Sequence, residues 1–306
     1  MISLTKAPWL IVAAFLFSTS MFAQKSAPKP QPKAAPRSVV FAVLDGGKRV
    51  EPIASIDGRK LVALDLGEGA PAKTFADAYY KPKSAYALIF GGAADGNVAI
   101  VKSNIGTECG GASAYTMLTT VKAKLSGLVM ALATNARIGA STTGFRRKPS
   151  IEERRRIETL VAAEFTKQGA PALAVKTLRY HNLTAIDVED DHLPEFVGSY
   201  WIAPTAAERR LLFFIAEQDA NGKIHFSVSE HSVVKPDGVM SGDVKDLDTG
   251  VGHELLLDVL DYDGDGVREI FTIGQAFEGN NYYVYKRGDG GKWAKVFETY
   301  NYRCAY

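Results

Sequence analysis

The chain has 306 residues, with 36 basic and 34 acidic side chains and 46% hydrophobic residues. This composition excludes a disordered or fibrous protein, and the length suits two domains with separate cores. Residues 1–37 hold five basic groups and no acidic one, so the rest of the chain is slightly acidic. A nucleic-acid partner is therefore not expected, because such a partner requires a basic face on the fold.

Targeting features come first in the chain. Lys6 precedes an apolar run from Trp9 to Phe17, and small or polar residues then lead to Ala23. This pattern predicts a signal peptide over residues 1–23 and a secreted or periplasmic protein. No later stretch is long and uncharged enough to span a membrane, so a transmembrane protein is not expected after cleavage. Residues 24–38 are rich in Pro, Ala and Lys and predict a solvated, semi-rigid tether.

Short strands are predicted across residues 39–138, where Asp-Gly turns separate runs of apolar residues. The runs begin at Val39, Pro52, Lys60, Ala85 and Asn97. They predict a β-sandwich or barrel-like domain, with a helix near residues 75–80. The segment 125–133 is mostly apolar, and its periodicity does not decide between helix and strand.

A linker and a helix follow this first domain. Residues 139–149 interrupt the strand pattern and predict a domain linker. Ser150 and Glu153 form an S-x-x-E capping box, and the apolar periodicity after them predicts a helix that ends at Gly169. Three consecutive arginines at 154–156 have acidic residues within helical reach, which favours a solvated face with ion pairs.

The remainder of the second predicted domain, residues 150–306, is strand-like. Eight apolar runs after Ala174 predict an antiparallel β-meander, so the whole chain is expected to be mainly β. The two cysteines, Cys109 and Cys304, fall in different halves of the chain. In an exported protein such a pair is compatible with one disulfide, and two separate thiols are the alternative.

The segment Asp261 to Glu269 carries the clearest chemical motif. Carboxylates at positions one, three, five and nine of one tight loop repel each other unless a cation lies among them. The predicted ligands are the side-chain oxygens of Asp261, Asp263, Asp265 and Glu269 and the backbone carbonyl oxygen of Val267. Hard oxygen donors of this kind suit Ca²⁺. An EF-hand would need Glu at position twelve, where this chain has Thr272 between predicted strands.

A second acidic loop lies 74 residues upstream. Its acidic residues occupy the same four side-chain positions, which predicts an internal repeat and a second, weaker calcium site. These residues are Asp187, Glu189, Asp191 and Glu195. His192 stands where the downstream copy has Gly266, so strained backbone geometry is expected there. The alternative for both loops is an Asp-rich turn without metal.

The two loops resemble the FG-GAP or VCBS family of integrin-like repeats, whose pattern is D-x-D-G-D-G-x-x-[DE] between strands. The resemblance covers about residues 174–230 and 253–298. It implies Ca²⁺ held in β-hairpin loops, with a role in stability, adhesion or ligand binding. Two loops are too few for a closed propeller, so we expect an open module of two repeats packed on the helix; the alternative is that the N-terminal strands are degenerate blades.

These features predict an exported calcium-binding protein that acts as an envelope or extracellular binding module for a protein or carbohydrate, with a mainly structural metal. The alternative is a secreted hydrolase of cell-wall or polysaccharide substrates. The sequence contains no nucleophile elbow, phosphate-binding glycine loop, H-E-x-x-H zinc motif or C-x-x-C pair. An acidic pocket with a pair of carboxyls at glycosidase separation and away from the acidic loops would favour the enzyme. A flat aromatic patch would favour the binding module.

Overall fold

The structure is a computed structural model that describes residues 37–64, 66, 70–105, 111–137, 144–219 and 221–302. The predicted signal peptide, most of the tether and both cysteines, Cys109 and Cys304, lie outside these residues. The described residues belong to one compact unit, 36–306, and are mainly β, which confirms the predicted fold class. None of the described helices is long and apolar enough to cross a membrane.

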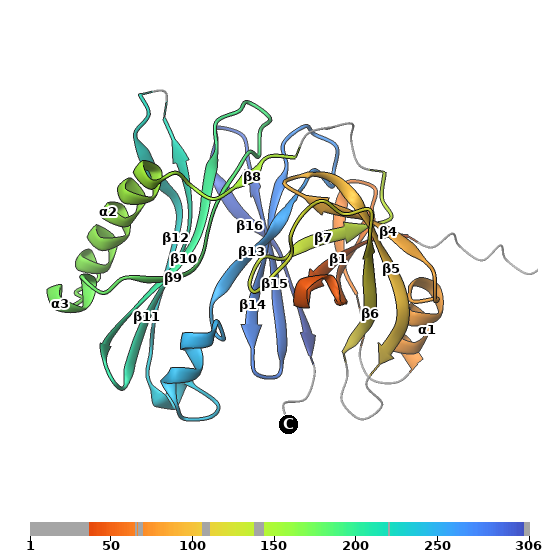
Figure 1. Cartoon of the computed structure of the whole chain (residues 1–306), viewed down its shortest axis with the longest axis horizontal. Coiled ribbons are helices and arrows are strands. Elements are labelled where there is room, and N and C mark those ends of the chain that lie inside the picture. Colours follow the sequence, from red (N-terminus) through yellow and green to blue (C-terminus); the bar gives the residue numbers. More distant parts are fainter. Residues whose placement is uncertain are drawn as a thin grey trace, which may run out of the picture. The chain divides into compact units, whose positions relative to one another are not determined.

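The first part of the chain forms a closed antiparallel barrel. Its strands are β1 (Ser38–Leu44), β2 (Arg49–Asp57), β3 (Lys60–Ala63), β4 (Ala85–Phe90), β5 (Ala93–Ile105), β6 (Ala112–Thr119) and β7 (Ala131–Thr134). The strand order is β1-β7-β4-β5-β6-β2-β3, and pairing of β1 with β2 closes six of the strands into the barrel (Figure 1). Helix α1 (Ala70–Tyr79) contributes Phe75 to the barrel core.

The second part forms two four-stranded meanders in separate sheets rather than one continuous meander. The outer sheet contains β9 (Arg179–Ile186), β10 (Glu195–Thr205), β11 (Glu208–Gln218) and β12 (Ile224–Val234), with the short β8 (Arg146–Arg147) at its edge. The central sheet contains β13 (Glu254–Leu260), β14 (Glu269–Ala276), β15 (Gly279–Arg287) and β16 (Trp293–Tyr302). The 3-10 helices η2 (Pro236–Gly238) and η3 (Val244–Thr249) connect them, and η1 (Asp45–Gly47) joins β1 to β2.

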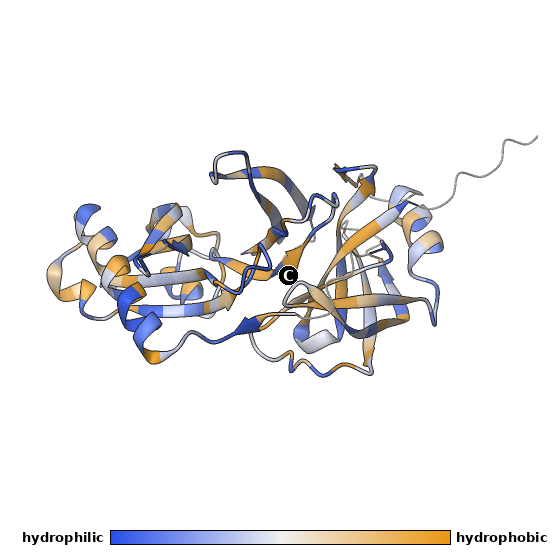
Figure 2. Cartoon of the chain, turned by 90° about the horizontal axis from the view of Figure 1, so that it is seen from above, coloured by the Kyte–Doolittle hydropathy of each residue, from blue (hydrophilic) through white to orange (hydrophobic). Residues whose placement is uncertain are grey.

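Strands β13 and β14 of the central sheet are buried on both faces, because their side chains alternate between two cores. Leu255, Leu257 and Phe271 pack on the barrel, against outward-facing residues of β1. Leu256 and Ile270 pack on the outer sheet. Figure 2 shows hydrophobic residues running along the strands in this middle part of the molecule. The predicted first and second domains therefore share a core.

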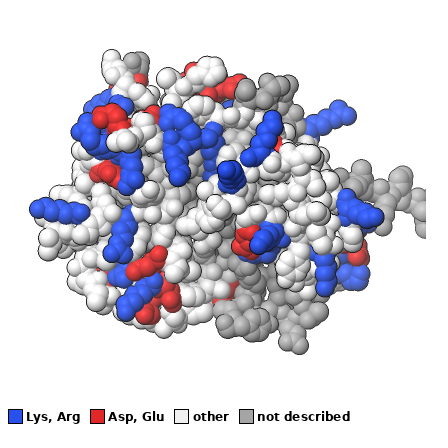
Figure 3. Space-filling model, viewed as in Figure 1, with Lys and Arg blue, Asp and Glu red and all other residues white. Residues whose placement is uncertain are grey.

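Helix α2 (Ile151–Lys167) covers the other face of the outer sheet through Ile157, Val161 and Phe165. The predicted capping box is confirmed, since the Ser150 hydroxyl accepts a hydrogen bond from the Glu153 N–H and the Glu153 carboxylate accepts one from the Ser150 N–H. The arginines of α2 form the expected ion pairs, and Figure 3 shows basic and acidic side chains intermixed over this helix. A short helix, α3 (Ala172–Val175), follows.

A buried ion pair joins the central sheet to the barrel. The Asp258 carboxylate is fully buried and lies 2.7 Å from the guanidinium of Arg146. It also accepts hydrogen bonds from the backbone N–H groups of Gly91 and Gly92 in the β4–β5 turn. Because burying a lone charge is strongly unfavourable, this network fixes the position of the barrel on the central sheet.

Candidate functional site

The two acidic loops occupy equivalent places in the two meanders. The upstream acidic loop, residues 187–194, connects the first and second strands of the outer sheet's meander. The downstream acidic loop, residues 261–268, connects the first and second strands of the central sheet. Each loop therefore connects the first two strands of its own four-stranded meander, which supports the internal repeat expected from the sequence.

The first carboxylate of each loop accepts the same backbone hydrogen bonds. Asp261 Oδ1 accepts from Gly264 N–H at 2.7 Å and Oδ2 accepts from Gly266 N–H at 3.1 Å. In the upstream loop, the Asp187 carboxylate accepts hydrogen bonds from the N–H groups at positions four and six, which are Asp190 at 2.7 Å and His192 at 2.9 Å. These bonds fold both loops around the carboxylate at position one.

The later positions also correspond. The carboxylate at position five accepts from the N–H at position seven in both loops, at 2.8 Å upstream and 2.9 Å downstream. Glu195 and Glu269, at position nine, each accept from the N–H at position two. His192 has a φ of 67°, in the left-handed region that Gly266 occupies without strain, which confirms the strain expected at His192.

Only the downstream loop brings its carboxylates together. Ligand oxygens of Asp261, Asp263 and Asp265 all lie within 4.8 Å of one another, and no other such group occurs among the described residues. Glu269 lies fully buried beneath them. The donor set fits Ca²⁺ in charge and oxygen type, and Val267 belongs to the same turn through its bond to Asp265.

A lysine ammonium already contacts this cluster. Lys286 Nζ, from β15, lies 2.8 Å from Asp263 Oδ2, 2.6 Å from Asp265 Oδ2 and 2.7 Å from Glu269 Oε1. Burial lowers the pKa of Lys286, but these hydrogen bonds raise it by more. Burial also raises the pKa of Glu269 to about 7 against the opposing effect of the ammonium. An ion at this loop therefore competes with a cation of the chain itself.

In the upstream loop, arginines rather than a lysine neutralise the carboxylates. Arg287, next to Lys286 in sequence, forms an ion pair with Glu189 and lies 3.0 Å from Glu217. The guanidinium of Arg268, in the downstream loop, donates a hydrogen bond to the backbone carbonyl of Asp187 at 2.8 Å and so links the two loops. Asp187, Glu189 and Asp191 do not converge on one point within the described residues. The predicted second metal site is therefore less complete than the first.

A pocket of about 540 Å³ lies between the outer and central sheets, away from both acidic loops. Strands β10 to β12 and β13 to β15 provide its walls, and its volume is in the range of small-ligand sites.

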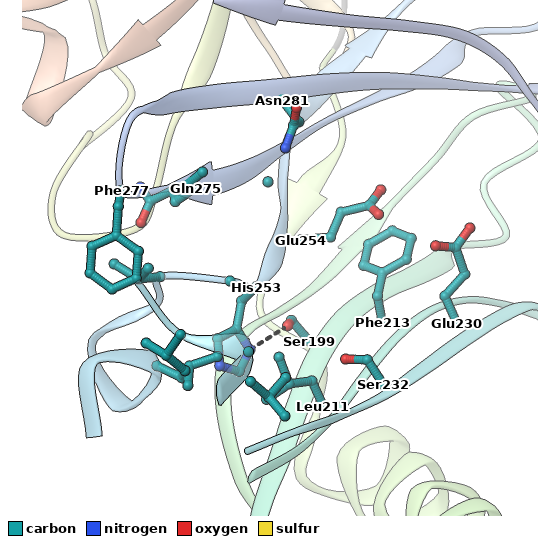
Figure 4. A pocket seen from close by; sticks show the side chains of 18 of the residues that line it. Ser199, Leu211, Phe213, Glu230, Ser232, His253, Glu254, Gln275, Phe277 and Asn281 are labelled. Atoms are coloured by element: carbon teal, nitrogen blue, oxygen red, sulfur yellow. Dashed lines mark hydrogen bonds between the residues drawn. The ribbon is translucent and has the colours of Figure 1, made fainter. Parts of the chain in front are cut away.

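Figure 4 shows the Ser199 hydroxyl directed at His253; the distance from Oγ to Nδ1 is 3.3 Å. Both residues are 1% exposed, and burial lowers the pKa of His253 to about 3. This pair is a structural contact, because the hydroxyl is inaccessible and the imidazole is a poor base.

Two carboxyls line the same pocket. Figure 4 shows Glu254 and Glu230 on either side of the Phe213 ring. The hydroxyl of Tyr285 donates a hydrogen bond to Glu230 Oε1 at 3.2 Å. Glu254 accepts a further hydrogen bond from Thr272 at 2.6 Å, and Glu230 lies 3.2 Å from the ammonium of Lys295. Sequence reasoning did not find this pair, since the residues belong to different sheets and no local motif surrounds them.

Glu254 predicts a pH dependence of stability. Burial raises its pKa from 4.5 to about 7, so its contribution to stability is complete below pH 4.5 and is lost as the pH rises through about 7. Glu254→Gln should remove this loss, which is at most about 3 kcal/mol. The groups that face Glu254 are Glu230, Lys295, Tyr283 and Tyr285. Urea unfolding at pH 5, 6 and 7.5 checks this, and the exposed Glu152→Gln variant should keep the wild-type slope.

Comparisons with protein-family models, with curated proteins and with solved structures give no match.

Proposed function

We propose that this chain is an exported calcium-binding module in which one Ca²⁺, held by the downstream acidic loop, stabilises the two meander sheets. The observation that carries this proposal is the convergence of three carboxylates within 4.8 Å. The shared hydrogen-bond pattern of the two loops supports it, as does the resemblance to FG-GAP or VCBS repeats. Asp261, Asp263, Asp265 and Glu269 would hold the ion, and the ion would supply positive charge to a junction rich in carboxylates.

The metal's role in this proposal is structural. The downstream loop lies where three parts of the fold meet, because Arg59 of the barrel approaches Asp263 at 3.7 Å and Arg268 contacts the upstream loop. A cation at this point offsets the repulsion among the carboxylates of the downstream loop. The module then presents its remaining surface to a protein or carbohydrate of the envelope or the extracellular space. Export itself is supported by the signal-peptide pattern of residues 1–23.

A thermal melt with chelator, followed by titration with Ca²⁺, tests the metal assignment. At one hundred times the dissociation constant, the ion adds about 2.7 kcal/mol, which corresponds to a rise in Tm of about 5 to 10 °C. Wild type and Glu189→Ala should both show this saturable rise, because Glu189 belongs to the upstream loop. Asp263→Ala should not. Absence of a shift at millimolar Ca²⁺, or equal shifts in all three proteins, would refute the assignment.

A further inference from the structure

We propose that an extended acidic peptide of a partner protein binds along the free edge of β9, in a groove of about 460 Å³ lined by basic side chains. This inference rests on the proposed role as a binding module and names the chemistry of its protein partner. It does not involve the calcium site, because no residue of either acidic loop lines the groove. The groove lies between β9, the segment 146–149, the start of α2 and three barrel-side residues, Phe90, Leu128 and Val129.

The groove follows the edge of β9 rather than one of its faces. Successive side chains of a strand point to opposite faces, so a pocket on one face contacts every second residue. Five consecutive residues of β9, from Tyr180 to Thr184, line this groove. Four consecutive residues from Arg146 to Pro149 line it as well. The backbones of both segments therefore border the groove.

This edge of β9 has no strand partner over most of its length. On one side, β9 pairs with β10 from Arg179 to Ile186. On the other side, β8 pairs only with Ala185 and Ile186. Among the described residues, the backbone of 180–184 forms no backbone hydrogen bond outside the pairing with β10. An unpaired edge of five residues, about 16 Å long, can accept an additional strand.

The groove is positively charged. Its basic residues are Arg146, Arg147, Lys148 and Arg154, and none of the described residues that line it is acidic. The carboxylates that pair with the three arginines lie outside the lining. Lys148 is exposed and forms no ion pair within the described part of the chain. Figure 3 shows several basic side chains close together between α2 and the barrel, in the region of β8. This charge complements an acidic ligand.

A buried side chain in the groove distinguishes a peptide from a simple anion. Asn182 lines the groove and is 9% exposed, yet neither its amide nitrogen nor its amide oxygen has a hydrogen-bond partner. Burial of an unpaired amide is unfavourable, so both atoms favour a ligand that can pair with them. A peptide backbone carries donors and acceptors and can satisfy both atoms. Phosphate or sulfate would satisfy only the nitrogen.

The charge of the groove favours a partner over the chain's own flanking segments. Residues 1–37 carry five basic side chains and no acidic one, so the groove repels them. Residues 138–143, which directly precede the groove segment in sequence, carry no charged side chain. The acidic peptide is therefore assigned to another protein.

The test uses the full chain and acetylated hexapeptides in which Glu alternates with Val, Tyr or Ser. Hydrogen-exchange mass spectrometry should show slower exchange within residues 179–184 when a peptide binds, because an added strand protects the edge amides. Peptides with Lys in place of Glu should not bind. Absence of protection with all three Glu peptides at millimolar concentration, or equal binding of the Lys peptides, would overturn the proposal.

Charge-reversal variants locate the binding site. Lys148→Glu combined with Arg154→Glu should raise the Kd for the peptide at least about tenfold, since each change replaces attraction by repulsion. The control combines Lys176→Glu with Lys167→Glu, which alters the net charge equally but outside the groove. Arg154 and Lys167 both belong to exposed ion pairs of α2, so the two double variants are matched. Equal Kd values for them would contradict the assigned groove.

Two further measurements separate strand addition from simple attraction of an anion. N-methylation of every second peptide nitrogen, in each of the two possible phases, should abolish binding in at least one phase, because it removes N–H donors that pair with β9. Inorganic phosphate should displace the peptide no better than chloride at equal ionic strength. Unchanged binding of both methylated forms, or stronger displacement by phosphate, would show an anion site without strand pairing and so refute the proposal.

Asp263→Ala separates this inference from the calcium assignment. The variant should bind the peptide with the Kd of wild type, because Asp263 does not line the groove. Loss of calcium binding with peptide binding retained would therefore leave the groove assignment intact. Loss of peptide binding in a folded Asp263→Ala variant would contradict it.

Discussion

Replacement of Arg146 by Met is expected to lower the free energy of unfolding by about 3 to 5 kcal/mol. The variant removes the counter-ion of Asp258, which is fully buried and joins the barrel to the central sheet. It also removes hydrogen bonds to the carbonyls of Met130 and Leu257. Three backbone N–H groups still bond to Asp258, but they do not neutralise its charge. Urea unfolding of purified wild type and variant gives the difference.

The matched control is Arg155→Met, because Arg155 forms an exposed pair with Glu152 at 2.7 Å. Loss of an exposed pair costs at most about 1 kcal/mol. Asp258→Asn added to Arg146→Met should recover part of the stability, since it removes the uncompensated charge. If Arg146→Met costs no more than Arg155→Met, the buried pair does not hold the barrel on the central sheet.

Lys286→Met is expected to destabilise the calcium-free protein by about 2 kcal/mol and to tighten calcium binding at least about tenfold. The ammonium of Lys286 contacts Asp263, Asp265 and Glu269, so its removal leaves their repulsion unopposed. The same removal frees these oxygens for an ion, which then need not displace a tethered cation. Unfolding measurements with chelator and calorimetric titration with Ca²⁺ give the two quantities.

Arg287→Met is the control for this prediction. Arg287 is adjacent to Lys286 but pairs with Glu189 and Glu217, outside the downstream loop. Its removal should lower stability without changing the dissociation constant for Ca²⁺. Equal constants for wild type and Lys286→Met would show that the ammonium does not compete with the ion.

Much of the fold could be predicted from local patterns. The Ser150 capping box and the strand beginning at Val39 are found where the sequence places them. Strand β6 was not predicted, because its buried residues Ala112, Ala114 and Thr116 are small or polar and give a weak hydrophobic alternation. The sequence predicts strands from directly after Ala174, but Val175 still lies in α3, since apolar runs this short do not distinguish helix from strand.

The shared core and the pocket depend on contacts between distant residues. The uninterrupted apolar run of β1 is typical of a strand buried on both faces, and this signal could have predicted that a second layer covers the barrel. The approach of Lys286 to the downstream loop follows from the pairing of β14 with β15, whose register the sequence alone does not give. Glu230 and Glu254 belong to different sheets, so only the packing of those sheets brings them to one pocket.

The most direct test of the calcium assignment is to count bound Ca²⁺ by equilibrium dialysis of the full chain, with Asp263→Ala and Glu189→Ala in parallel. We predict one ion per chain in wild type and Glu189→Ala and none in Asp263→Ala, because only the downstream carboxylates converge. No bound ion in wild type, or one ion retained by Asp263→Ala, would contradict this account.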